Sequence, residues 1–183
     1  MLKLLDHLEE GLITVLMAAA TLIIFVAVVH RYTLGIPVLH PYVVDFSTSW
    51  AQEVCIYLFI WMAKFGAAYG VRTGVHVGVD VLVNRLQEPW RHRMILFGLW
   101  SGAMFTAIIG TLGAHFVWVI SRTDQISSDM EMPMWLVYLC IPLGSYLMCF
   151  RFLQVARKFQ LTNTLPHVDP LHVAGMPEGA VPP

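Results

Sequence analysis

Residues 50–80 have the sequence WAQEVCIYLFIWMAKFGAAYGVRTGVHVGVD, and they decide how the rest of the chain is interpreted. The apolar part, about residues 50–71, is long enough for a membrane-spanning helix, which needs about 20 residues. It nevertheless contains Glu53 near its start and Lys64 well inside it. An ionisable side chain at the centre of a bilayer costs about 2.5–3.5 kcal/mol on insertion scales. We therefore expect both side chains to face protein or water.

Three further apolar runs of spanning length flank this stretch, at about residues 11–29, 94–120 and 133–150. The chain has 183 residues, of which 57% are hydrophobic and 13% charged, and its mean hydropathy is +0.67. Soluble domains contain roughly 25% charged residues. These values predict an all-α integral membrane protein with four transmembrane helices. The first run follows an acidic lead and is too long for the apolar part of a signal peptide, so we expect an uncleaved span.

The predicted four-helix membrane domain covers residues 1–161, and residues 162–183 form a predicted disordered cytoplasmic tail. Five of the ten prolines fall in those last 22 residues, a composition typical of disorder. We expect that deleting this tail leaves function intact. The three cysteines lie inside apolar runs without a CxxC spacing, so the sequence predicts neither a disulfide framework nor a zinc site.

Proline and small residues shape the last two predicted spans. Pro133 is expected at the first helical position of the fourth span, where the missing N–H costs nothing, and Pro142 should kink that span. In the third span, small residues recur at every fourth position and predict a ridge for close helix packing: Gly98, Gly102, Thr106, Gly110 and Ala114.

An amphipathic helix is predicted between spans two and three. Its apolar stripe has helical spacing, and its other face is polar. A lone strand would leave backbone groups unpaired at a membrane, so a helix lying in the interface is favoured. The stripe consists of Val79, Leu82, Val83, Leu86 and Trp90.

The basic residues predict the orientation. Eight of the eleven Lys and Arg residues fall before span one, between spans two and three, or after span four; two fall on the opposite side, and Lys64 lies inside the membrane. The excess of Lys and Arg on the cytoplasmic side of membrane proteins then places both termini in the cytoplasm. The two exceptions are Arg31 and Arg122.

Glu53 and Lys64 share a helix face but lie eleven residues, about 16 Å, apart along the axis, so they cannot pair. We interpret Glu53 either as an interfacial residue near water or as a contact to a partner subunit. Lys64 can snorkel to water or meet a partner carboxylate or a lipid phosphate. Arg72 is expected to anchor on lipid phosphate.

His76 and Asp80 share a helix face, but two ligands make a weak metal site, so a structural role or a contact to a partner is favoured. A different hypothesis is a haem- or quinone-binding membrane anchor that uses His30 and His115, because both histidines are predicted near the outer ends of their spans. A histidine among small residues is more often hydrogen-bonded by a neighbouring helix. The sequence therefore predicts no metal, cofactor or catalytic site.

Two patches of the sequence carry a family resemblance. The first patch is Trp50-x-x-Glu53, Trp61, Phe65-Gly66-Ala67-Ala68 and Arg72-x-Gly74-x-His76-Val-x-Val79-Asp80. The second patch is Pro133-Met-Trp135-x-x-Tyr138-x-x-Ile141-Pro142-x-Gly144. Together they resemble the small membrane subunit, DctQ type, of tripartite ATP-independent periplasmic (TRAP) transporters. Two residues depart from the family's pattern: Lys64, which is polar, and Gly78, which is small.

The resemblance implies a transport subunit of the bacterial inner membrane, and not an enzyme. A periplasmic substrate-binding protein (DctP type) would deliver an organic acid to a large membrane subunit (DctM type), which would carry the substrate and sodium sites. C4-dicarboxylates, sialic acids, other sugar acids and keto acids all stay open as substrates. The small subunit would be the scaffold of the large one, with no nucleic-acid partner. The implied contacts to the partner subunit or to lipid are Glu53, Trp61, Lys64, Arg72, His76 and Asp80.

Overall fold

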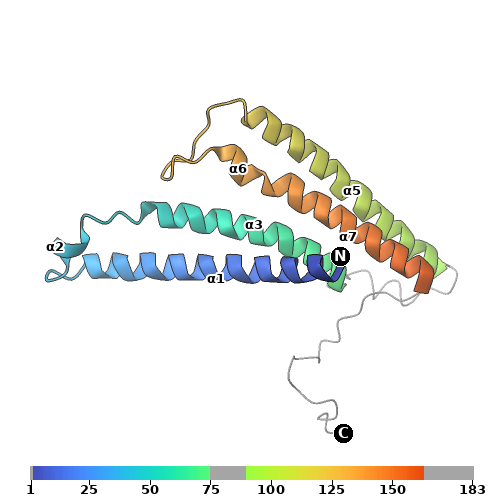
Figure 1. The fold of residues 1–183 in the computed structure, drawn as a ribbon, viewed down its shortest axis with the longest axis horizontal. Coiled ribbons are helices and arrows are strands. Elements are labelled where there is room, and N and C mark those ends of the chain that lie inside the picture. The colour runs from blue at the N-terminus through green and yellow to red at the C-terminus, as the bar shows by residue number, and fades with distance from the viewer. Residues whose placement is uncertain (1, 75–89, 163–183) are drawn as a thin grey trace, which may run out of the picture.

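The computed structural model describes residues 2–74 and 90–162 and is built from helices (Figure 1). Four of the helices in these residues are long and apolar enough to cross a membrane, as the sequence predicts. The predicted interfacial helix between spans two and three lies outside the described residues, apart from its last residue, Trp90, which begins the third long helix. The helices are α1 (Leu2–Leu34), α2 (His40–Val43), α3 (Ser49–Thr73), α5 (Trp90–Ile120), α6 (Met134–Tyr138) and α7 (Cys140–Thr162).

The long helices lie in a row in the order α1, α3, α7, α5 (Figure 1). Helix α3 packs against α1 on one side and α7 on the other, and α7 also packs against α5. Helices α1 and α5 are therefore the outer members, and they are inclined to each other in the view of Figure 1. This row leaves much of α1 uncovered by the other described helices, with exposed apolar side chains along most of its length.

Small residues decide how closely α5 and α7 approach. A Cβ atom at Gly110 would lie 3.0 Å from the Tyr146 ring, and one at Gly113 would lie 2.7 Å from Ile141. The middle of the predicted ridge packs against α7 as expected. Towards the end of α5, Gly113 lies at the contact in place of the predicted Ala114, and at the start of α5 a Cβ atom at Gly98 would have open space. Four residues turn a helix by about 400°, so a stripe at every fourth position drifts around the helix. A straight contact line needs alternating steps of three and four.

Helix α3 joins its two neighbours through other small side chains. Ala51 of α3 and Ala20 of α1 are buried. The two helices are joined where the Cys55 thiol of α3 donates to the Ala20 carbonyl over 3.3 Å. On the other side, a Cβ at Gly144 of α7 would lie 2.7 Å from the Lys64 Cβ. All three cysteines are free thiols in the structure.

The fourth span is interrupted, as Pro142 predicts, although the break lies at Leu139 between α6 and α7. Proline lacks the N–H that would bind the carbonyl four residues earlier, so the helix is weakened in the preceding turn. Pro133 is not the first helical residue as expected. It is the extended residue before α6, with ψ 122°.

Several boundaries differ from the sequence predictions. Helix α1 extends beyond the predicted residues 11–29 at both ends, and α5 begins at Trp90 instead of residue 94. The fourth span was expected to close at Phe150-Arg151, but α7 continues to Thr162. The reason is that Arg151 does not mark the membrane surface: its side chain is buried inside the helix packing. The first loop also contains a short helix, α2, which begins beside Pro41.

Candidate functional site

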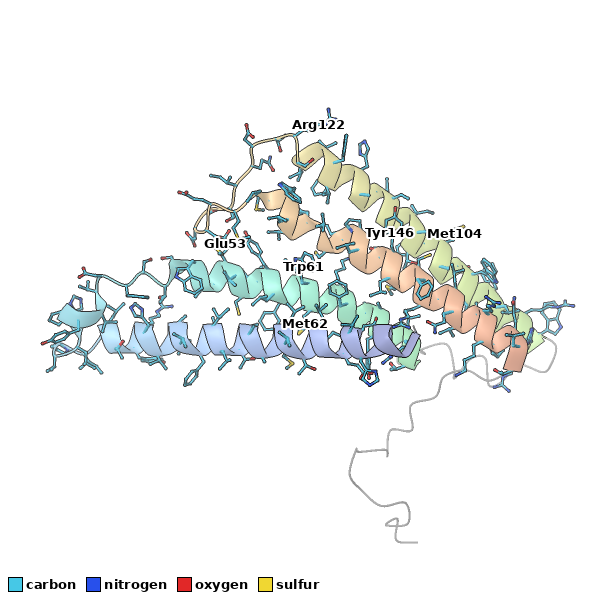
Figure 2. All side chains as sticks on the ribbon, viewed as in Figure 1. Glu53, Trp61, Met62, Met104, Arg122 and Tyr146 are labelled. Atoms are coloured by element: carbon cyan, nitrogen blue, oxygen red, sulfur yellow. The ribbon has the colours of Figure 1, made fainter. Side chains whose placement is uncertain are left out.

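Glu53 attaches the loop between α5 and α6 to the start of α3. Its Oε2 atom accepts the backbone N–H groups of Asp129 (2.9 Å) and Met130 (3.1 Å). Its Oε1 atom accepts the hydroxyl of Tyr57, one turn further along α3. Hydrogen bonds to an ionised acceptor are roughly twice as strong as neutral ones. Glu53 therefore fixes this loop against a helix that is distant in the sequence (Figure 2).

The loop itself is closed by its own hydrogen bonds. Ser127 donates its N–H to the Met132 carbonyl over 2.8 Å, and its buried hydroxyl accepts the Met132 N–H over 3.3 Å. Met134 donates to the Gln125 carbonyl at 3.0 Å. Glu131 lies at the tip with a left-handed φ of 52°. A pre-formed loop presents its two N–H groups to Glu53 in fixed positions. We name the contacts of Glu53 with Tyr57 and with the N–H groups of Asp129 and Met130 the outer clamp.

A second polar connection joins the start of α1 to α7. The Arg151 guanidinium donates to Glu9 over 2.5 Å, and the side chains are 0% and 2% exposed. Arg151 also donates to Gln154, one turn further along α7, over 2.9 Å. The other carboxylate oxygen of Glu9 has no hydrogen-bond donor among the residues that the structure describes.

The next residue, Glu10, makes an ion pair with Arg72 near the end of α3. The Arg72 guanidinium also lies over the Tyr69 ring, 4.8 Å from its centroid. Two neighbouring glutamates of α1 thus bind two different helices. We name the Glu9–Arg151 and Glu10–Arg72 pairs the inner clamp, since they lie at the end of α3 opposite Glu53.

The inner clamp is not predicted from the sequence. The residues before the first span are predicted only as an acidic lead, and Arg72 as a contact to lipid or to the partner subunit. One local signal for the buried pair existed: Arg151 stands between Phe150 and Phe152 in an uninterrupted helical pattern. Its partner is 142 positions away in the sequence, and no local pattern identifies a residue at that distance.

Glu53 has a hydrogen-bond partner in its own helix, because the Tyr57 hydroxyl donates to it. The contact of Glu53 with a partner subunit stays a prediction. Lys64 is half-buried, and its Cβ rests against the position of Gly144. Within residues 7–74 and 90–162, its ammonium has no carboxylate or carbonyl partner. Trp61 packs on Phe65, with ring centroids 5.8 Å apart.

The other predicted residues are not brought together. His76 and Asp80 lie outside the described residues. The His30 ring interacts through one nitrogen with the Val43 carbonyl and through the other with the Thr48 hydroxyl, each at 3.1 Å. His115 is exposed, and α1 and α5 are the outer helices of the row. The described residues contain no group of three His, Cys, Asp or Glu side chains suited to a metal.

The polar contacts described above have a structural role. In the described part of the chain, the buried or half-buried carboxylates are used to hold helices and a loop together. A substrate site needs polar groups that are free to bind a ligand, and transporters build such sites from interrupted helices near the membrane midplane. Among the described residues the interruption of the last span, at Leu139, lies about one and a half turns from the start of that span, close to its end.

Comparisons with known proteins agree on one family. Residues 20–160 match the family described as tripartite ATP-independent periplasmic transporters, DctQ component. The chain is 53% identical, over 202 aligned positions, to the C4-dicarboxylate TRAP transporter small permease protein DctQ of Rhodobacter capsulatus, covering 96% of this chain and 86% of that protein. It is 31% identical over 173 positions to the protein of the same name from Vibrio cholerae serotype O1, covering 82% and 70%.

Proposed function

The chain belongs to the DctQ component family of tripartite ATP-independent periplasmic transporters, and from this premise we propose that it is the scaffold subunit of a C4-dicarboxylate transporter. Both relatives named above are small permease proteins of C4-dicarboxylate transporters. The substrate class follows from that agreement, whereas the scaffold role rests on this structure. A large membrane subunit (DctM type) would carry the substrate and the coupling sodium ion. A periplasmic protein (DctP type) would deliver the substrate.

The scaffold role is supported by one observation: ionisable side chains of this chain bind other parts of the same chain. Glu9, Glu10 and Glu53 each join two elements that are distant in the sequence. A carboxylate held by a buried guanidinium or by two backbone N–H groups is not available to bind sodium or to exchange a proton. The two clamps instead fix the row of helices at both ends, which suits a subunit that gives a larger partner a rigid surface.

Lys64 is the residue we propose for direct contact with the large subunit. It is half-buried within a membrane span, and no anion among the described residues pairs with it. An unpaired cation in hydrocarbon is costly, and a carboxylate on a partner helix would remove that cost. Trp61, one turn earlier on α3, would pack at the same contact, while Arg72 is already engaged within this chain.

The orientation is part of the proposal. The inner clamp and the start of α5 would lie on the cytoplasmic side, together with both termini, because most of the basic residues gather there. The outer clamp would then lie on the periplasmic side. There the fixed loop between α5 and α6 would be available to meet the binding protein.

The test is a pull-down of the tagged chain from native membranes in mild detergent, with mass identification of its companions. We expect a stoichiometric large subunit with wild type and at least a fivefold loss with Lys64→Leu. Arg122→Leu is the control, because that exposed cation lies over Trp118 beyond the end of α5. A wild-type chain that purifies alone contradicts the scaffold role. Equal yields of the two variants contradict only the role of Lys64.

A further inference from the structure

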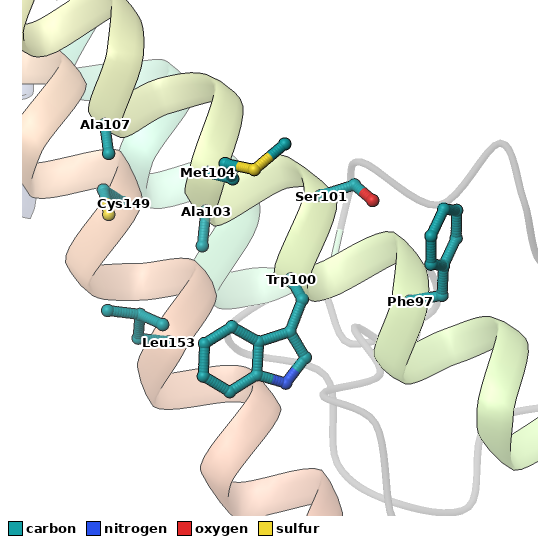
Figure 3. Close-up of a pocket in the computed structure, with 8 residues that line it drawn as sticks. All are labelled: Phe97, Trp100, Ser101, Ala103, Met104, Ala107, Cys149 and Leu153. Carbon is teal, nitrogen blue, oxygen red and sulfur yellow. The ribbon is translucent and has the colours of Figure 1, made fainter.

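An apolar groove of about 520 Å³ lies between α5 and α7 and opens to the side (Figure 3). It extends along α5 from Phe97 to Ala107, about 15 Å at 1.5 Å per residue. This length is half of the roughly 30 Å hydrocarbon core, or one leaflet. Its lining includes Phe97, Trp100, Met104 and Ala107 of α5 and Cys149 and Leu153 of α7.

Both walls of the groove carry a cation one turn nearer the membrane surface. Arg93 precedes Phe97 by four residues, and Arg157 follows Leu153 by four. Residues four apart on a helix lie on the same face, so each arginine lies on the same helix face as a residue that lines the groove. The Arg93 guanidinium lies 5.8 Å from the centroid of Trp90.

The two cations belong to one packed end of the molecule. The rings of His92 and Phe159 stack with centroids 5.0 Å apart and hold the start of α5 against the end of α7. Arg91 and Lys158 add two more exposed positive charges there. In the residues that the structure describes, none of the four cations has a carboxylate within ion-pair distance.

Among the described residues, two acidic side chains near this end, Glu9 and Glu10, already hold other guanidinium groups. Glu9 binds Arg151, and Glu10 binds Arg72. The exposed Trp90 is 61% accessible and is suited to the level of the lipid headgroups, where tryptophan is enriched in membrane proteins. The groove is therefore apolar at its depth and positive at its surface end.

We propose that this groove binds an anionic phospholipid, with the phosphate between Arg93 and Arg157 and one acyl chain along the groove. Basic pockets between transmembrane helices bind anionic headgroups, and the groove has the length of a single leaflet. Trp100 forms the wall of the groove beside Leu153 (Figure 3). A partner helix in this place would leave the cations unpaired unless it also supplied acidic residues at that depth.

The experiment measures lipid binding to the full chain in detergent by native mass spectrometry. The probes are dioleoyl phosphatidylglycerol and dioleoyl phosphatidylcholine, which share their acyl chains and differ in net charge. We expect at least tenfold tighter binding of phosphatidylglycerol. Arg93→Gln with Arg157→Gln should weaken it about 30-fold, from about 1 kcal/mol per cation near anionic lipid. The control is Arg31→Gln with Arg122→Gln, which removes the same charge at the opposite end.

The groove is tested separately from the headgroup site. Ala107→Leu shortens the groove and should weaken the binding of dioleoyl phosphatidylglycerol about tenfold, by displacing about two buried CH₂ groups. The binding of dihexanoyl phosphatidylglycerol, which has shorter acyl chains, should be unaffected. Trp100→Ala removes part of the groove wall without filling the groove, and it should also weaken the binding of dioleoyl phosphatidylglycerol. Circular dichroism and gel filtration check that each variant is folded.

Three results would overturn the proposal. The first is equal binding of the two headgroups, and the second is an equal loss in the control pair, which would show unspecific attraction. The third is groove variants that bind lipid normally but lose the large subunit in the pull-down, since the groove would then be a protein contact. Failure of the scaffold role would appear differently, as a wild-type chain that purifies alone.

Discussion

Replacing Arg151 by methionine removes the guanidinium that binds Glu9 inside the helix packing. Arg151 is 0% exposed and the Glu9 side chain 2%, so water does not replace the lost donor. The second Glu9 oxygen already lacks a donor among the described residues, which leaves the carboxylate without compensation. Breaking one partner of a buried ion pair costs about 3–5 kcal/mol. We expect a loss of that size in the free energy of unfolding.

A set of variants separates charge from packing. Glu9→Gln keeps an oxygen that can accept from Arg151 and should cost less, about 1.5–3 kcal/mol, the range for one hydrogen bond to a charged group. Glu9→Leu combined with Arg151→Met removes both charges and should recover most of the stability, because apolar replacement of a buried pair is often neutral. Arg157→Met is the matched control: it is an exposed arginine on the same helix and should change stability by less than about 0.5 kcal/mol.

The assay is reversible unfolding in mild detergent by titration with sodium dodecyl sulfate, followed by far-ultraviolet circular dichroism. The double variant closes a thermodynamic cycle, which reports the coupling between the two side chains. The reasoning fails if Arg151→Met lies within 1 kcal/mol of wild type. It also fails if the double variant is as unstable as the two single losses added together.

Two further predictions concern the helix contacts and the outer clamp. Gly144→Ala should lower the free energy of unfolding by about 1–3 kcal/mol, since its Cβ would meet the Lys64 Cβ at 2.7 Å. Gly98→Ala should raise it by up to about 1 kcal/mol, because nothing lies within 4 Å of a Cβ there. Thermal unfolding of both variants checks this, and stability changes of the same sign would count against it. Glu53→Gln should speed hydrogen exchange about tenfold at the two loop N–H groups that Glu53 accepts, from the loss of about 1.5 kcal/mol. Glu131→Gln, in the same loop, is the control, and unchanged protection in Glu53→Gln would refute the outer clamp.

The sequence alone determined the class of protein and the number of spans. A spanning helix depends on about 20 consecutive apolar residues, and this property is local, so it can be counted without knowing what the helix packs against. The same holds for the interruption caused by Pro142, because the missing N–H acts within one turn. The motifs around Glu53 and Pro133 likewise lie in continuous stretches, and they identified the family that the comparisons confirm.

Which polar groups meet depends on how distant segments pack together in the fold. Glu9 and Arg151 are 142 positions apart, and Glu53 and the Asp129 N–H are 76 apart. Each pair forms because the helices lie in the order α1, α3, α7, α5 and because Gly110, Gly113 and Gly144 allow close approach. Hydropathy is the same for every order of four apolar helices. The partner of a buried charge therefore depends on packing between distant segments, which the sequence specifies only through the complete fold.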